Sequence, residues 1–247
     1  RLLPADATVG GAVQFASLFC PSAHVSGDIF NVVPLGEDHC AFYVVDVAGH
    51  GVQASLTAVS LSSILTRDFL TGVESGRAPQ AVREVAIPSV ERVVAALNER
   101  FQTDHELSSY FTMIYGVFDA AAGLVRMCQA GHPLPIYVPA RGDARVVGSG
   151  GYPVGLLASA SYQAEEIVVE PGDRLYLYSD GITDCMNRHD EPFGDARLLD
   201  YVQAERERPI GEILSGLEAR VAGWKGERLL HDDLSMLALD VLVRERS

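Results

Sequence analysis

The amino-acid sequence predicts an α+β layered sandwich, and three observations lead to this prediction. Apolar segments of strand length recur along the chain, and several lie in pairs joined by a brief turn, as antiparallel strands do. Segments with a helical period fall between groups of strands, so the alternating βαβ pattern of a doubly wound sheet is missing. A length of 247 residues, 48% hydrophobic and 21% charged, suits one globular domain, and we expect residues 1–247 to form it.

The first part of the chain is expected to form three strands and then a helix. The strands are expected at 11–19, 28–33 and 40–46, and the last two form a hairpin that brings Asp28 toward Asp46 if the register pairs them. Beyond Gly51 the apolar period changes from two to about 3.6, which predicts a helix that runs to about residue 70. The expected apolar face holds Val52, Leu56, Val59, Leu61, Ile64, Leu65 and Phe69. The segment at 71–79 is expected to be a surface loop, with a flap over a site as the alternative.

The remainder of the chain is dominated by strands. A helix is expected at 89–101, with Ser89 as its N-cap. A strong hairpin signal covers 110–119 and 124–130, which are joined by a turn that ends at Gly123. Extended segments are expected at 134–138, 144–147, 162–170, 173–179 and 232–243, and further helices at 195–203 and 210–221.

The charge balance narrows the class of partner. The chain has 19 basic and 33 acidic residues, a net charge of −14, whereas nucleic acids and anionic membranes require a basic surface. A protein partner is therefore expected. The four cysteines, Cys20, Cys40, Cys128 and Cys185, have no Cys-x-x-Cys spacing, which indicates reduced thiols in a cytoplasmic protein. We find no signal peptide and no apolar run long enough to span a membrane.

Aspartates stand at the ends of three predicted strands. They are Asp46, Asp180 before Gly181, and the pair Asp232 and Asp233, with Asp28 as a fourth candidate. Two carboxylates 4 Å apart repel by roughly 4 kcal/mol at an effective dielectric of about 20, so a cation is expected between them. Oxygen ligands favour Mg²⁺ or Mn²⁺, whereas zinc prefers histidine or cysteine. Any one of these aspartates is equally well explained by a turn, but together they favour a metal site.

Aspartate metal centres most often serve phosphoryl chemistry, in which two ions activate a water and clamp the phosphate oxygens. The sequence has no phosphate-binding Walker loop, no Gly-x-Ser-x-Gly elbow and no cysteine-phosphatase spacing, which agrees with an attacking water. His50, close to Asp46, is a candidate for proton transfer. His132 is expected to cap or pack a turn, with catalysis as the less favoured alternative. Ser179 is expected to be only a strand residue.

A set of short motifs follows one order along the chain from about residue 20. The motifs are Ser26-Gly27-Asp28, Val45-Asp46-Val47-Ala48-Gly49-His50-Gly51, Phe111-Thr112-Met113, Ala130-Gly131-His132-Pro133, Gly155-Leu156-Leu157, Pro171-Gly172-Asp173, Tyr178-Ser179-Asp180-Gly181 and Asp232-Asp233-Leu234-Ser235. Together they resemble the SpoIIE/RsbU branch of the PPM (type 2C-like) metal-dependent serine/threonine protein phosphatases. One motif would be a weak signal, but the ordered set is specific.

The resemblance implies a four-layer αββα sandwich of two mainly antiparallel sheets flanked by helices, with two Mn²⁺ or Mg²⁺ ions at one end. It implies that Asp46 bridges the ions, that the Val47 carbonyl binds one of them, and that Asp180 and Asp232 complete the other. Asp28 is implied as a ligand, directly or through water. On this pattern Asp46, Asp180 and Asp232 are catalytic, while Asp233, Gly181 and His50 are supporting residues.

Three positions of this chain leave a choice open or differ from the family pattern. The type 2C pattern has Asp-Asn at the position of Asp232 and Asp233, so Asp232 matches the ligand, although the choice between the two stays open. Many relatives carry a carboxylate where this chain has Asn31. Eukaryotic members hold the phosphate with an arginine, and we find no obvious equivalent.

The resemblance also implies a function. It predicts metal-dependent hydrolysis of phosphoserine or phosphothreonine on a small anti-anti-sigma (STAS) protein, in signal transduction of the two-component or anti-sigma type. Such domains commonly follow a receiver or sensor domain, and the start at Arg1, inside an ordinary segment, agrees with a piece of a longer chain; a homodimer is a further expectation. The alternatives are a non-catalytic PPM-fold interaction module in a partner-switching pathway and a hydrolase of small phosphoesters.

Overall fold

Two antiparallel sheets stacked face to face form the centre of the fold. The computed structural model describes residues 7–9, 11–22, 26–49, 51–66, 69, 87, 89–103 and 109–242. Sheet A consists, in spatial order, of β1 (Ala7–Val9), β2 (Val13–Cys20), β11 (Leu234–Val241), β10 (Arg174–Tyr178), β7 (Ile136–Val138) and β8 (Arg145–Val146). Sheet B consists of β3 (Asp28–Pro34), β4 (His39–Val47), β5 (Phe111–Asp119), β6 (Leu124–Ala130) and β9 (Ala164–Val168).

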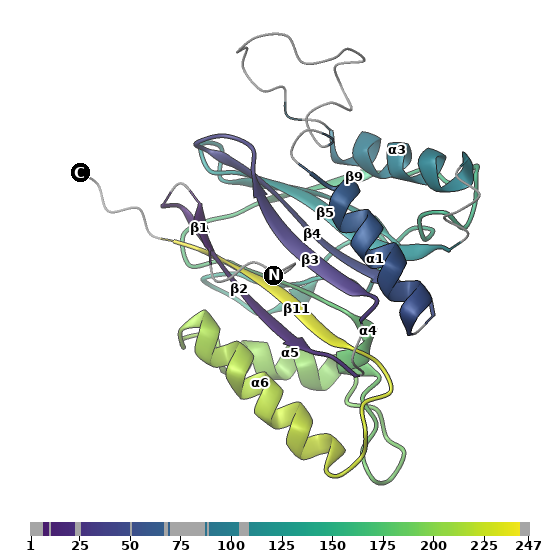
Figure 1. The fold of residues 1–247 in the computed structure, drawn as a ribbon. Helices are drawn as coiled ribbons and strands as arrows, with labels where there is room; N and C mark the ends of the chain where they lie inside the picture. The colour runs from purple at the N-terminus through teal and green to yellow at the C-terminus, as the bar shows by residue number, and fades with distance from the viewer. Residues whose placement is uncertain are drawn as a thin grey trace.

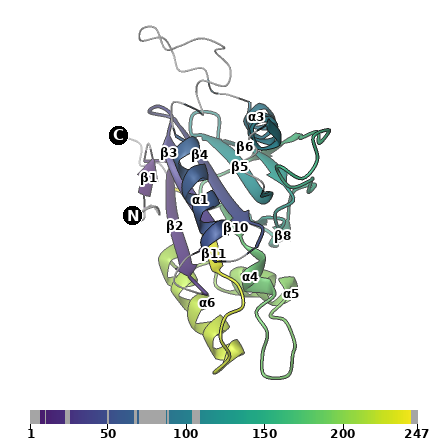
Figure 2. The same ribbon diagram turned by 45° about the vertical axis from the view of Figure 1, so that its right-hand side comes forward.

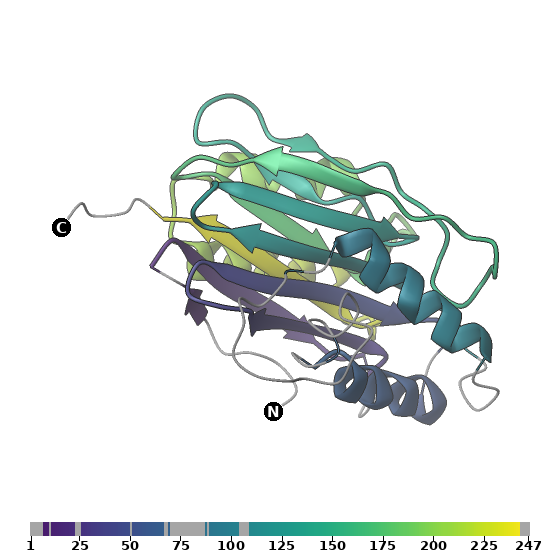
Figure 3. The ribbon, with the colours of Figure 1, turned by 90° about the horizontal axis from the view of Figure 1, so that it is seen from above.

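Helices cover the outer face of each sheet. The helices α1 (Val52–Ile64) and α3 (Val90–Thr103) lie over sheet B, whereas α5 (Asp195–Ala204) and α6 (Ile210–Lys225) lie over sheet A (Figures 1 and 2). Seen from above, α1 and α3 lie side by side on the strands of sheet B (Figure 3). The short helix α4 (Asp180–Thr183) follows the end of β10. The predicted four-layer αββα sandwich is therefore confirmed.

Strand alternation divides the apolar residues into three layers. Phe42 and Val44 of β4 enter the cluster between the sheets, whereas Tyr43 and Val45 enter the cluster under α1 and α3. The third cluster lies between sheet A and its two helices. Successive side chains of a strand point to opposite faces, so a strand buried on both faces reads as one continuous apolar run, as residues 40–45 do. The core between the sheets is the layer that positions the candidate site.

The apolar face predicted for α1 is wrong in part. Val52, Leu56 and Val59 are exposed by 67%, 63% and 47%, while Ala54 and Ala58 are buried against sheet B. The helix carries no charged residue, and its apolar residues lie all round it, so the period does not select a face. The two alanines face the sheet, where their small side chains permit close packing.

Most other boundaries agree with the sequence within a few residues. The strand β1 was not expected, α1 ends at Ile64 instead of near residue 70, and α6 extends four residues beyond its predicted end at 221. Asp180 begins a short helix instead of ending a strand. The predicted loop at 71–79 lies outside the described residues. In the part of the chain that the structure covers, none of the helices has the length and apolar character needed to cross a bilayer.

Candidate active site

A polar layer closes one end of the core between the two sheets. Phe30, Val44 and Ile114 point into the space between the sheets. Because the side chains of a strand alternate, the residue two positions closer to this end of the core on each of these strands points into the same space. In sheet B these neighbours are Asp28, Asp46 and Thr112, and in sheet A the continuation beyond Leu177 and Leu237 is Ser179, Ser235 and Asp233. The sequence thus exchanges apolar for polar residues at one end of five strands at once.

Asp28 and Asp46 are direct neighbours across the hairpin of β3 and β4. The register pairs Asp28 with Asp46, as the hairpin prediction required. Asp28 is 4% exposed, and its Oδ2 atom has no hydrogen-bond partner among the described residues. Burial, followed by the charge of Asp46, raises the pKa of Asp28 well above its usual range, and the hydroxyls of Ser235 and Ser179 offset part of this effect.

Asp180 and Asp232 belong to the same electrostatic cluster. Burial, then the charge of Asp180, then that of Asp232 raise the pKa of Asp46 to about 7. Burial and then the charge of Asp232 raise the pKa of Asp180 as well. Asp28 is buried, Asp46 is partly buried, and Asp180 and Asp232 are exposed. The cluster therefore runs from the interior to a mouth that solvent and a ligand can reach.

Asp233 serves a different role from Asp232. One oxygen of the Asp233 carboxylate accepts hydrogen bonds from the Ser22 backbone N–H at 2.7 Å and from the Ser22 hydroxyl at 3.0 Å. Its other oxygen accepts from the Gly27 N–H at 3.2 Å. Asp233 is 5% exposed and thereby ties the end of β2 and the start of β3 to β11. Its oxygens are occupied within the protein, which favours Asp232 as the residue that faces a ligand.

Ser179 and Gly181 hold the end of β10 against the start of β11. The Ser179 hydroxyl donates to the Asp233 carbonyl at 3.1 Å and accepts from the Ser235 N–H at 3.1 Å. A Cβ atom at Gly181 would lie 2.1 Å from the Asp233 carbonyl oxygen, so this position requires glycine. Ser179 is thus a strand-end residue with a bridging role, and Gly181 supports the site by allowing Asp180 and Asp232 to approach.

The Val47 carbonyl adjoins a second glycine. A Cβ atom at Gly27 would lie 3.2 Å from this oxygen, which is closer than most such contacts. The absence of a side chain at Gly27 therefore leaves space at the carbonyl that the family pattern makes a metal ligand. Asn31 follows the opposite orientation from Asp28 along β3, toward the helices, where it is paired with Tyr43. The missing carboxylate at Asn31 is thus on the other face of the sheet from Asp28.

The donor chemistry of the cluster fits a hard divalent cation. Within the described residues, the ion pairs involve none of Asp28, Asp46, Asp180 and Asp233, so the carboxylates are not neutralised by arginine or lysine there. Their charges raise one another's pKa, and one buried oxygen has no partner. As the side chains stand, no three His, Cys, Asp or Glu side chains of the described part converge closely enough to hold an ion. A bound cation would have to draw them together.

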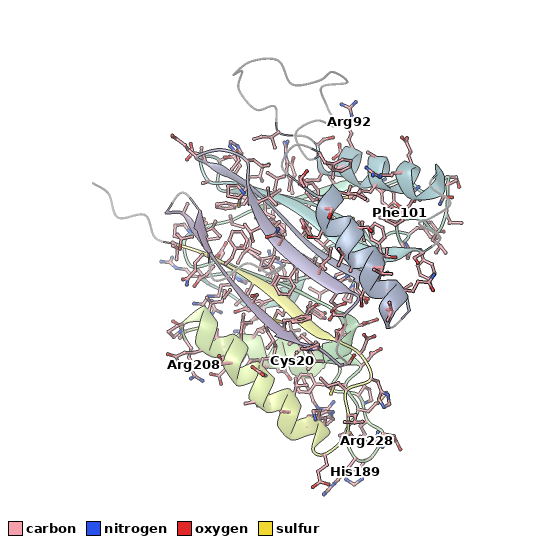
Figure 4. All side chains as sticks on the ribbon, in the orientation of Figure 1. Cys20, Arg92, Phe101, His189, Arg208 and Arg228 are labelled. Atoms are coloured by element: carbon pink, nitrogen blue, oxygen red, sulfur yellow. The ribbon has the colours of Figure 1, made fainter. Side chains whose placement is uncertain are left out.

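Two large hollows lined by described residues contain none of these carboxylates. One of about 620 Å³ is lined by His39 and Asp119 at the opposite end of sheet B, and one of about 770 Å³ is lined by His189 and Arg228 beyond α6 (Figure 4). A pocket of about 50 Å³ does adjoin Gly181 and Asp232. The chemistry is therefore expected at a shallow, acidic mouth instead of a deep cavity.

The two histidine predictions have different outcomes. His50 lies outside the described residues. His132 is 3% exposed and follows the turn at Gly131, in agreement with a packing role, and burial lowers its pKa to about 3. The sequence analysis missed its partner, Thr112, whose Oγ1 lies 2.8 Å from His132 Nδ1. The occurrence of both residues in the ordered motifs was the only signal for this pair.

Asp173, in another of the motifs, is structural. Its carboxylate accepts hydrogen bonds from the Tyr137 hydroxyl and from the N–H groups of Ala140 and Glu170. It therefore fixes the turn that begins β10, at the end of the strand remote from Asp180.

Comparisons with known proteins identify the family of the chain. The family model described as Stage II sporulation protein E (SpoIIE) matches residues 36–242. The chain is 24% identical over 233 residues to phosphoserine phosphatase RsbP of Bacillus subtilis. The aligned region covers 94% of this chain and 53% of RsbP. The matched region is between 37% and 63% of the length of the curated relatives, so the chain spans only part of them.

Solved structures match the fold. The SiaA-PP2C domain of Pseudomonas aeruginosa superposes with a TM-score of 0.76 at 20% identity, over 92% of this chain and 85% of that one. RsbX in complex with magnesium matches with a TM-score of 0.62 at 13% identity, over 93% of this chain and 96% of that one. The family match extends over most of the sequence, and the chain therefore belongs to the SpoIIE family.

Proposed function

We propose that this domain is a Mn²⁺- or Mg²⁺-dependent protein serine/threonine phosphatase that uses an activated water to hydrolyse phosphoserine or phosphothreonine on a regulatory partner. The observation that carries the proposal is the acidic cluster, in which Asp46 lies opposite Asp28 and its pKa responds to Asp180 and Asp232. Four carboxylates from distant parts of the chain, gathered at one solvent-facing mouth, are unfavourable unless a cation binds there.

The residues would hold two ions as the family pattern implies. Asp46, the Val47 carbonyl, Asp180 and Asp232 would hold the ions, and Asp28 would contribute directly or through water. When bound, such ions lower the pKa of water and neutralise phosphate oxygens. Magnesium in the RsbX structure supports the capacity of this fold to bind such an ion. Asp233 and Gly181 would act by holding Asp232 and Asp180 in place.

The protein residues also explain why no side-chain nucleophile is required. The four cysteines are free thiols, and burial raises the pKa of Cys40 and Cys128 to about 12, so neither would be a thiolate at neutral pH. The Ser179 hydroxyl is engaged in hydrogen bonds that join the end of β10 to the start of β11. Water is thus the nucleophile that the site favours.

The proposed partner is a phosphorylated anti-anti-sigma (STAS) protein in the cytoplasm. The resemblance to the RsbU branch supports it, and the net charge of −14 supports a protein partner over nucleic acid or an anionic membrane. An N-terminal receiver or sensor domain and a homodimeric active form complete the proposal. The observation that RsbP is a phosphoserine phosphatase by name supports phosphoserine as the substrate residue.

The decisive experiment measures phosphate release from p-nitrophenyl phosphate and from a phosphoserine STAS protein. Each is measured with Mn²⁺, with Mg²⁺ and with chelator, for the wild type, Asp46→Asn and Asp143→Asn. Asp143 is an exposed aspartate in the connection between β7 and β8 and is the matched control. We expect turnover that requires metal, that Asp46→Asn reduces by about 100-fold or more, and that Asp143→Asn leaves unchanged.

The outcomes separate the alternatives. Unchanged turnover in Asp46→Asn would refute the role of the acidic cluster. Binding of Mn²⁺ and of the STAS protein without turnover of either substrate would favour the interaction module. Turnover of p-nitrophenyl phosphate but of no phosphoprotein would favour a hydrolase of small phosphoesters.

A further inference from the structure

We propose that His132 is a positioning residue, which fixes the Thr112 hydroxyl beside Asp46 and spaces sheet B from the strand of sheet A that leads to Asp180. The inference rests on the proposed phosphatase function. It adds to that function a pair of residues, Thr112 and His132, that are not among the predicted metal ligands and lie 20 positions apart in the sequence. It concerns the placement of Asp46 and Asp180, which come from different sheets.

Thr112 occupies the position next to Asp46 in sheet B. The register of β4 and β5 pairs Asp46 with Thr112 and Val47 with Phe111. Phe111 faces the helices, where its ring meets that of Phe101 edge-on, with centroids 4.8 Å apart. Phe101 is labelled on α3 in Figure 4. By alternation Thr112 has the orientation of Asp46 and Ile114, toward the space between the sheets. Asp28, Asp46 and Thr112 therefore form one row across three strands.

His132 extends this row from the end of β6. Its Nδ1 atom lies 2.8 Å from the Thr112 hydroxyl oxygen. Its Nε2 atom is buried without a hydrogen-bond partner among the described residues, and the backbone of Tyr178 in sheet A is close enough to the ring to affect its pKa. Tyr178 ends β10, two residues before Asp180. The imidazole thus stands between the neighbour of Asp46 and the strand that leads to Asp180.

Hydrogen bonds of the surrounding loop fix the backbone of His132. The His132 carbonyl accepts a hydrogen bond from Gln129 Nε2 at 2.6 Å, and Gln129 Oε1 accepts from the Gly150 N–H at 2.8 Å. Gly131 has a φ of 72°, and a Cβ atom there would lie 2.6 Å from the Pro153 ring. The loop that sets the ring therefore does not depend on the carboxylates, so the ring can act as a fixed spacer for them.

The direction of the hydrogen bond between Thr112 and His132 depends on the tautomer of the ring. If the Nε2–H group points toward the Tyr178 carbonyl, Nδ1 is the unprotonated nitrogen and accepts the Thr112 O–H. Burial keeps the ring neutral at neutral pH, which removes it as a proton donor in catalysis but suits a constant acceptor.

The variants are chosen to separate an effect on the placement of Asp46 from an effect on the stability of the fold. Thr112→Val removes the hydroxyl at nearly constant shape, and Thr112→Ser retains it. His132→Asn keeps a polar group near Nδ1, whereas His132→Leu removes it. Thr57→Val is the control, because within the described part of the chain the buried Thr57 hydroxyl donates only to the Gln53 carbonyl of its own helix, at 3.2 Å.

The measurements are kcat and KM for p-nitrophenyl phosphate, the Kd for Mn²⁺ by calorimetry, and the melting temperature without metal. We expect Thr112→Val and His132→Leu each to lower kcat, and to weaken Mn²⁺ binding, by about tenfold, the effect of one lost orienting hydrogen bond. We expect KM to change little, Thr112→Ser and His132→Asn to restore most of both losses, and Thr57→Val to change neither. The double variant Thr112→Val/His132→Leu should be no worse than either single variant.

Three results would overturn the inference. They are full kcat and Mn²⁺ affinity in Thr112→Val, additive losses in the double variant, and a fall in melting temperature with no change in either quantity. If the wild type binds Mn²⁺ but does not hydrolyse phosphoesters, the proposed phosphatase function fails, whereas the Mn²⁺ affinities of the same variants still decide the positioning role.

Discussion

Asp46→Asn is expected to stabilise the metal-free domain while it abolishes the metal response. In the folded chain the pKa of Asp46 rises from 3.8 to about 7. A carboxyl group whose pKa is higher in the folded state favours folding below its unfolded value, and this contribution is lost as the pH rises from 3.8 to about 7. The ionised group therefore opposes folding at neutral and alkaline pH.

The magnitude follows from the size of this shift. Each pKa unit corresponds to about 1.4 kcal/mol, so ionised Asp46 costs on the order of 4 kcal/mol at pH 8 and almost nothing near pH 4. Asparagine keeps the shape but removes the charge. Because its buried amide retains a desolvation cost, we expect about 2–4 kcal/mol of stabilisation at pH 8. Saturating metal at about 100 times Kd should stabilise the wild type by about 2.7 kcal/mol and the variant much less.

The assay is urea unfolding of chelator-treated protein, followed by circular dichroism at pH 4.5 and pH 8, with and without Mn²⁺. The exposed Asp143→Asn variant is the control for loss of one negative charge from a chain of net charge −14. An Asp46→Asn variant that is no more stable than the wild type at pH 8, or equally stabilised at both pH values, would show that the acidic cluster is not strained without a cation.

Three further predictions follow from single contacts. His132 has a folded pKa of about 3 against 6.5 unfolded, so the stability that is full above pH 6.5 is lost as the pH falls toward 3; the loss is about 2 kcal/mol at pH 5, and urea unfolding should show it in the wild type but not in His132→Asn. Asp233→Ala leaves the Ser22 and Gly27 donors without their acceptor and should lower the free energy of unfolding by about 1–3 kcal/mol in the same assay. An unchanged midpoint would show that these hydrogen bonds do not stabilise the fold. Gly181→Ala forces the Asp233 carbonyl to move and should reduce metal affinity and activity, while Gly211→Ala, where a Cβ meets nothing within 4 Å, should change neither.

Much of the fold could be predicted because the physical signals were local. The apolar run at residues 40–45 is buried on both faces, and the turn before it sets the register that pairs Asp28 with Asp46. The exposed face of α1 could not be predicted, because the helix is apolar on every side and only contact with the sheet decides which residues are buried. Val52 and Leu56 therefore had the same sequence signal as the buried Leu61.

The site divides in the same way. Separate aspartates at strand ends were visible in the sequence, but two adjacent carboxylates, Asp232 and Asp233, have the same chemistry until the donors around each are known. The hydrogen bonds from Ser22 and Gly27 distinguish them. The contact of Thr112 with His132 depends on the registers of strands that are brought together only by the fold. Spacing alone could not reveal it.

The dispersed origin of the acidic cluster has a consequence for biosynthesis. Asp28 and Asp46 come from the first hairpin of sheet B, whereas Asp232 precedes β11, which pairs between β2 and β10 in sheet A. A nascent chain still lacking β11 would have neither sheet A complete nor the cluster assembled. Under the proposed function, premature termination or proteolytic loss of that strand would yield a product without hydrolytic capacity, and partial fragments could not dephosphorylate the regulator.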